Sequence, residues 1–112
     1  MAESKHTSSR AARSLAGYHF ARDNYTGAIP FFEAALAINP LFARSWFILG
    51  CAYVKQESWP DAVRAFRRCT NIEEEDAEAW NNLASCYLRM PDVGGIVRPS
   101  LSLPARPSRP TD

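Results

Sequence analysis

Apolar residues recur along this chain with the spacing of an amphipathic helix. Trp46, Leu49, Gly50 and Tyr53 occupy positions i, i+3, i+4 and i+7, which share one face of an α-helix. A second apolar series with helical spacing follows, made up of Ala62, Phe66, Cys69 and Ile72. The pattern predicts two amphipathic helices, one on each side of the polar segment 55–61.

That polar segment carries the residues of a turn and a helix start. Ser58 is a residue type that caps helices, and Pro60 suits a first helical turn. Asp61 stands three residues after Ser58, as in a capping box. The two helices and the segment between them therefore predict a helix-turn-helix unit.

The whole pattern returns when the sequence is shifted by 34 residues, so that Trp46 falls on Trp80 and Tyr53 on Tyr87. The other matched sets are Leu15/Leu49/Leu83, Ala16/Gly50/Ala84, Tyr25/Trp59, Ala28/Ala62, Phe32/Phe66, Ala35/Cys69 and Ile38/Ile72. Small residues in these sets would let paired helices approach closely where large aromatic side chains pack between them. A fixed period of this length predicts an all-α chain of repeated helix hairpins.

The repeated residues resemble a known family. The series Trp46-x-x-Leu49-Gly50-x-x-Tyr53, followed by Ala62, Phe66 and Cys69, resembles the tetratricopeptide repeat (TPR). The resemblance implies an α-solenoid with units 9–42 and 43–76 and an incomplete unit 77–90, after a polar flank 1–8. Segments 24–33, 49–53 and 79–83 are similar, more narrowly, to an internal part of one group of much longer eukaryotic members.

After Met90 the pattern of the family is lost. Five of the eight prolines lie from Pro91 onward, and segment 91–112 is rich in Pro, Ser and Arg. Prolines stop helices, and this composition is typical of disorder. We therefore expect a disordered tail. A splice isoform, a truncated product and a natural short protein would all give such a sequence.

The incomplete third unit predicts an adhesive end, by which we mean an exposed apolar face at the C-terminal end of the repeats. Trp80, Leu83 and Tyr87 would normally pack against the second helix of their unit, which the sequence does not supply. We expect this face to be covered by a partner, by a second copy or by tail residues folding back, namely Val93, Ile96, Val97 and Leu101.

Composition narrows the class of protein. The 112 residues suffice for one domain, and 13 Lys and Arg against 12 Asp and Glu leave a net charge of +1, which predicts neither specific nucleic-acid binding nor membrane binding. No signal peptide or spanning segment is evident, so we expect a soluble intracellular protein in the cytoplasm, with the nucleus as an additional site. Cys51, Cys69 and Cys86 are widely spaced at apolar positions, which favours buried thiols over a zinc site.

In this family the first helices of stacked units line a concave groove, so positions between the packing residues are candidate partner contacts. We single out Arg13, Phe47, Cys51, Asn81, Asn82, Ser85 and Arg89. Arg13 with the two asparagines would hold a peptide backbone or an acidic side chain, and Phe47 with Val54 an apolar one. The alternative, that these are solvated helix faces, stays open.

Other activities find less support. Some members of the family bind the C-terminal carboxylate of heat-shock proteins, and the matching positions here hold Arg13, Gly17, Ile48, Glu78 and Asn82. Only Arg13 keeps a comparable positive charge, and Glu78 would repel a carboxylate, so this kind of binding is not expected. His19 holds a packing position and no phosphate-binding loop is present, so neither an enzyme nor a cofactor is expected. The acidic run 73–76 reads as a helix start, or alternatively as a contact for a basic partner.

The tail offers an alternative binding function. Pro104, Pro107 and Arg109 fit the P-x-x-P-x-R pattern that SH3 domains bind, although a plain disordered terminus has the same composition. We therefore expect a protein-interaction scaffold or adaptor that binds a protein or peptide. The resemblance further implies a role in chaperone-linked complex assembly. The alternatives are a truncated isoform with little activity of its own and an SH3 ligand carried on a repeat fragment.

Overall fold

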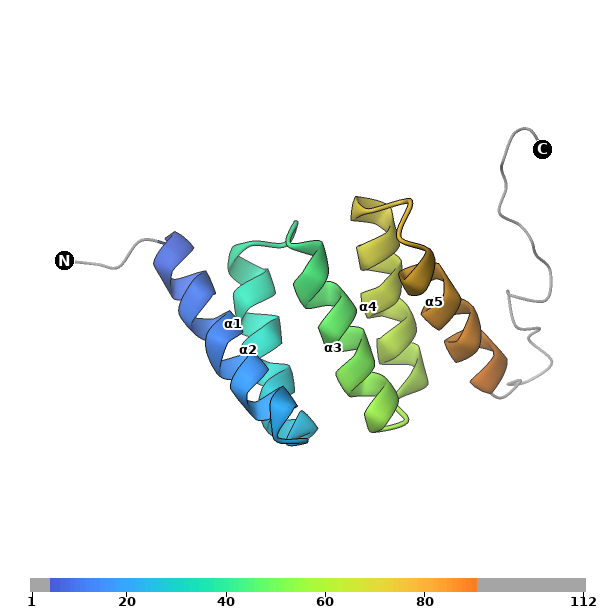
Figure 1. The fold of residues 1–112 in the computed structure, drawn as a ribbon, viewed down its shortest axis with the longest axis horizontal. Coiled ribbons are helices and arrows are strands. Elements are labelled where there is room, and N and C mark those ends of the chain that lie inside the picture. The colour runs from blue at the N-terminus through green and yellow to red at the C-terminus, as the bar shows by residue number, and fades with distance from the viewer. Residues whose placement is uncertain (1–4, 91–112) are drawn as a thin grey trace.

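The computed structural model describes residues 5–90, which form five helices and contain no strand. The helices are α1 (Lys5–Ala21), α2 (Tyr25–Ile38), α3 (Ala43–Lys55), α4 (Trp59–Ile72) and α5 (Ala77–Arg89). Each helix packs against the next one in the chain, and the five lie side by side in chain order (Figure 1). The predicted all-α architecture of repeated helix hairpins is confirmed.

Polar side chains start two of the helices. Asn24 Oδ1 accepts a hydrogen bond from the Gly27 N–H at 3.0 Å at the start of α2. Asp76 Oδ1 accepts one from the Ala79 N–H at 3.1 Å at the start of α5. These bonds satisfy backbone donors that have no partner within their own helix. The prediction that the acidic run begins a helix is therefore confirmed at Asp76.

The capping box predicted for α4 is wrong in its chemistry. Ser58 does occupy the N-cap position, but its side chain accepts no backbone hydrogen bond. The Ser58 hydroxyl instead donates to Asp61 Oδ2 at 2.7 Å. This bond joins the N-cap residue to the first turn of α4, and the hydroxyl proton goes to the carboxylate of Asp61.

The turns within the two hairpins share one conformation. Asp23 and Glu57, which are one repeat apart, adopt left-handed φ angles of 62° and 58°. The residue after each donates its N–H back into the preceding helix, from Asn24 to the His19 carbonyl at 2.8 Å and from Ser58 to the Tyr53 carbonyl at 2.9 Å. Such a left-handed residue is a common way to end a helix.

The core is built from the small and aromatic residues that the repeat aligns. Ala16, Ala28 and Ala62 are fully buried, and Phe66 is 1% exposed. Phe66 packs edge-on against Phe47, with ring centroids 5.6 Å apart. Cys69 and Cys86 are also buried, as predicted, whereas Cys51 is half-buried.

A hydrogen bond between successive hairpins is repeated as well. The Trp46 indole N–H donates to the Pro40 carbonyl at 2.7 Å, and the Trp80 indole N–H donates to the Glu74 carbonyl at 2.8 Å. The acceptor is a backbone oxygen, so Glu74 can replace the proline found at the equivalent position 40 without loss of the bond.

The predicted N-terminal flank 1–8 overlaps the first helix, because α1 begins at Lys5. The division of the chain into repeat units 9–42, 43–76 and 77–90 stays a prediction. The predicted tail 91–112 lies outside the described residues, and with it lie Val93, Ile96, Val97 and Leu101 and the motif of Pro104, Pro107 and Arg109.

None of the five helices is both long and apolar enough to pass through a lipid bilayer. Within residues 5–90, no group of three or more His, Cys, Asp or Glu side chains lies close enough to hold a metal ion.

Candidate partner-binding surfaces

Arg13 is held in place by residues on both sides of it. Its Nη1 donates to Ser9 Oγ at 3.2 Å, and its guanidinium carbon lies 4.1 Å from the centre of the Phe42 ring. Ser9 is buried, and its hydroxyl donates to the Ala35 carbonyl of α2 at 3.4 Å. Arg13 is thus a half-buried cation oriented by α1, α2 and the turn that follows, where apolar Leu41 is 73% exposed.

The predicted site residue Cys51 lies where α3 faces α5. Burial raises the pKa of its thiol, and the nearby carboxylate of Glu78 raises it further, while Arg44 and Lys55 act in the opposite direction. The thiol therefore stays protonated at neutral pH and offers a neutral, weakly polar contact. Arg44 and Lys55 contribute positive charge around Cys51.

The other predicted contacts are not all equivalent. Asn81 and Ser85 are exposed on α5, and Asn82 is half-buried. Within residues 8–90, Arg13 makes no hydrogen bond to either asparagine. Arg89 is exposed, and its guanidinium lies 5.3 Å from the Trp59 ring centre, so it is anchored on the start of α4.

Phe47 departs most from its expected role. It is only 7% exposed and belongs to the core through its contact with Phe66. Its outer face lies 5.2 Å from the guanidinium of Arg44. The aromatic ring therefore supports Arg44 and leaves almost no surface for an apolar side chain of a partner.

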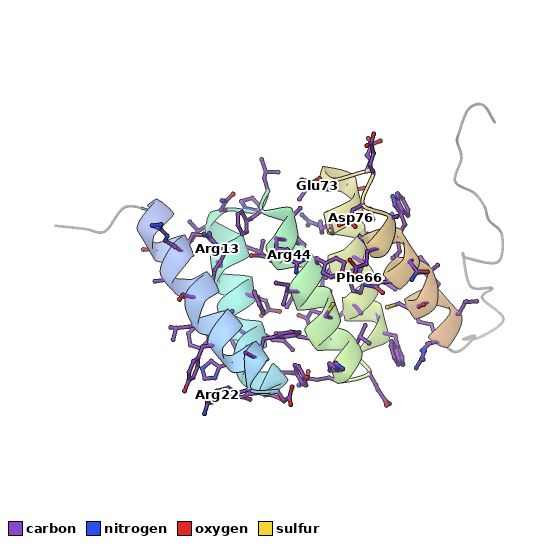
Figure 2. The ribbon with its side chains drawn as sticks, viewed as in Figure 1. Arg13, Arg22, Arg44, Phe66, Glu73 and Asp76 are labelled. Carbon is purple, nitrogen blue, oxygen red and sulfur yellow. The ribbon has the colours of Figure 1, made fainter. Side chains whose placement is uncertain are left out.

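Charge is separated along the chain in a way that the net charge conceals. α1 and α3 contain no Asp or Glu, and their basic residues are Lys5, Arg10, Arg13, Arg44 and Lys55. Four consecutive acidic residues occupy 73–76 instead, in the turn before α5. Figure 2 shows Arg13 and Arg44 at the same end of the helix stack as Glu73 and Asp76, with Arg22 at the opposite end.

The predicted adhesive end needs one correction. Leu83 is 6% exposed, because it already packs in the core between α4 and α5, so it is not an open contact. Trp80 is 38% exposed and Tyr87 is half-buried, while Leu88, which was not predicted, is 60% exposed. The exposed apolar surface of α5 therefore runs through Trp80 and Leu88.

A second arrangement of polar residues lies on α2, α3 and α4, and it was not predicted. The Tyr53 hydroxyl donates to Glu33 Oε2 at 2.5 Å. Burial, and then this hydrogen bond, raises the pKa of the tyrosine. Arg64 donates to Asp61 Oδ1 at 2.9 Å, and the Ser58 hydroxyl and this guanidinium hold the pKa of Asp61 below its usual range. The repeat gave no signal for Glu33, because the position one repeat later holds Arg67, and the position one repeat before Arg64 holds Pro30.

Comparison with known sequences agrees with this architecture. Residues 6–41 and 47–94 match a family described as "Tetratricopeptide repeat". A TPR repeat-containing protein of Schizosaccharomyces pombe is 42% identical over 82 residues, which are 73% of this chain and 10% of that protein. The Tetratricopeptide repeat protein 27 homolog of Dictyostelium discoideum is 56% identical over 54 residues, which are 48% of this chain and 6% of that protein.

The budding-yeast protein named "Essential for maintenance of the cell wall protein 1" is 30% identical over 87 residues, covering 71% of this chain and 10% of that protein. This chain thus spans about a tenth or less of the length of these relatives. The narrower resemblance, which was to an internal segment of tetratricopeptide repeat protein 27, is confirmed by the Dictyostelium match.

Proposed function

This chain belongs to the tetratricopeptide repeat family, and from that premise we propose that it is a scaffold that binds a partner protein or peptide across α1, α3 and α5. The observation that carries the proposal is the set of basic residues on α1 and α3, which occurs without any acidic residue in either helix. A segment with acidic side chains would meet Arg13 and Arg44 first.

The anchoring of Arg13 supports this assignment. A guanidinium that is already oriented by a hydroxyl and an aromatic ring loses less conformational entropy when it binds a carboxylate. The exposed side chains of Asn81 and Ser85 supply hydrogen-bonding groups of the kind that contact a peptide backbone.

The wider role is part of the same proposal and follows from the resemblance of the sequence to its family. We assign the chain to chaperone-linked assembly of protein complexes in the cytoplasm or nucleus, acting as a non-enzymatic adaptor. A shortened isoform of a much longer protein, with little activity of its own, is the alternative, and it is supported by the small share of each relative that this chain covers.

A pull-down from cell extract with three variants tests the proposal. Arg13→Glu reverses the anchored cation, and Arg22→Glu makes the same change on an exposed arginine at the opposite end of the stack. A chain ending at Met90 removes the tail. We expect Arg13→Glu alone to lose the partner. Loss only on truncation at Met90 would assign binding to the tail motif, and equal loss with both arginine variants would contradict a defined site.

A further inference from the structure

A cleft of about 360 Å³ opens between α2 and α4, away from the residues of the proposed partner surface. Its lining includes Glu33 and Leu36 from α2, Pro40 from the turn between α2 and α3, Trp46 from α3, and Arg64 and Arg68 from α4. Protein pockets that bind small ligands begin at roughly this volume. The space therefore suits one or two side chains rather than a long peptide.

Trp46, a residue of the cleft lining, is held by two contacts. The Trp46 indole is tied to the Pro40 carbonyl by a hydrogen bond of 2.7 Å. The guanidinium of Arg68 lies 5.2 Å from the centre of a Trp46 ring. An aromatic ring fixed at its polar edge, with a cation stacked against it, presents a preformed surface to a ligand.

The two arginines of the cleft differ in their partners. Arg64 forms an ion pair with Asp61 at 2.9 Å, and the negative charge of Glu33 also stabilises the Arg64 guanidinium and raises its pKa. Glu33 in turn accepts the hydroxyl proton of Tyr53 in a hydrogen bond. In the part of the chain that the structure describes, Arg68 forms no ion pair. Arg64 is thus electrostatically satisfied, whereas Arg68 is a cation of the cleft lining without a carboxylate partner in the described part of the chain.

From this geometry we infer that the cleft is a second partner-binding site, which takes a protein segment with one Asp or Glu beside an aliphatic side chain. The carboxylate pairs with Arg68, and the aliphatic group packs on Trp46, Leu36 and Pro40. The cleft contains none of the partner-surface residues Arg13, Arg44, Asn81 and Ser85, although it takes part of its lining from α3.

Two short blocked peptides test the inference on the 112-residue chain. One contains Leu-Glu-Leu between glycines, and the other has Gln in place of Glu. Binding is followed by the NMR resonance of the Trp46 indole N–H, assigned with Trp46→Phe. We expect the Glu peptide to shift this resonance and the Gln peptide to bind about fivefold more weakly.

Four variants locate the binding energy. Arg68→Gln should weaken the Glu peptide about fivefold, and Arg68→Lys less, because lysine keeps the charge but not the planar stacking. Arg67→Gln, which removes an exposed arginine outside the cleft lining, and Arg13→Glu should leave binding unchanged. Circular dichroism melts confirm that each variant is folded.

Several results would overturn the inference. These are equal binding of both peptides, no shift of the Trp46 resonance with either, or full binding by Arg68→Gln. The same shift with inorganic phosphate alone would mark a general anion site instead of a site for a protein segment. Loss through Arg13→Glu would assign the peptide to the surface of α1, α3 and α5, whereas failure of the cleft leaves that proposal standing.

Discussion

A Cβ atom on Gly50 would lie 2.7 Å from Cζ of Phe66, closer than side chains approach one another. Gly50 belongs to α3 and Phe66 to α4, so this contact sets how closely the two helices of the second hairpin pack. The ring has little freedom to move, since Phe66 is 1% exposed and meets Phe47 at its edge. The absence of a side chain at position 50 is therefore a packing requirement.

Gly50→Ala should destabilise the chain despite the better helix propensity of alanine. The propensity gain is about 1 kcal/mol, whereas forcing a methyl group into a filled core costs about 1–3 kcal/mol. We expect a net loss of about 1 kcal/mol in the free energy of unfolding, measured by urea denaturation. Gly50→Ala combined with Phe66→Leu should lose less than the sum of the two single changes, because the smaller side chain makes room for the methyl group.

Gly17→Ala provides the matched control for Gly50→Ala. Gly17 lies inside α1, and a Cβ there would meet no atom within 4 Å. Only the propensity term remains, so this variant should gain about 0.5–1 kcal/mol. Equal effects of the two substitutions would contradict the steric role of Phe66.

Glu57→Gly should stabilise the second hairpin. Glu57 holds a φ of 58° in the α3–α4 turn, where a side chain with a Cβ is strained by about 1–2 kcal/mol. Glycine removes this strain but adds entropy to the unfolded chain, which leaves a net gain of about 0.5 kcal/mol. Thermal melts should show a higher Tm for Glu57→Gly than for Glu57→Ala. An equal Tm for the two variants would mean that the left-handed turn stores no strain.

The repeat made the architecture predictable from sequence. A period of 34 residues marked Trp46, Tyr53 and Gly50 as packing positions, and the structure places each of them against a side chain of a neighbouring helix. Small and aromatic residues with helical spacing can bury their surface only by pairing helices, so the sequence pattern and the fold express the same constraint.

The site was less predictable, because a position within a repeat does not say how a side chain is oriented. Phe47 stands between packing residues in the sequence, yet its ring turns inward against Phe66. Glu33 and Arg68 lie on second helices, which the groove prediction did not consider, and they meet Tyr53 and Trp46 only after folding. Such contacts depend on rotamers and on neighbouring elements that no periodicity encodes.

Asp61→Asn should make stability less dependent on pH. The pKa of Asp61 is lowered in the folded chain, so its contribution is present above the pKa of an unfolded aspartate, about 4, and is lost as the pH falls through the folded value. Because the carboxylate is 42% exposed, we expect a loss below about 1 kcal/mol at pH 7. As the pH falls below the folded pKa the deficit should shrink toward zero, because the wild-type carboxyl is then also uncharged. Glu75→Gln removes an exposed acid and serves as the control, and a constant deficit for Asp61→Asn from pH 7 to pH 2 would contradict the shift.

Trp80→Ala should lower both the stability and the self-association of this chain. The substitution removes the bond from the indole to the Glu74 carbonyl and the buried part of a side chain that is 38% exposed, which together cost about 2 kcal/mol. The exposed part is the surface that we expect a second copy or a partner to cover, so the mass in solution, measured by light scattering, should also fall.

Leu88→Ser separates the two effects of Trp80→Ala. Leu88 is 60% exposed on the same helix, so its replacement should weaken self-association while changing the unfolding free energy by no more than about 0.5 kcal/mol. If Trp80→Ala left both quantities unchanged, α5 would not be the adhesive end of the stack. If Leu88→Ser lowered stability as much as Trp80→Ala does, the exposed surface would contribute to the folded chain itself rather than to association.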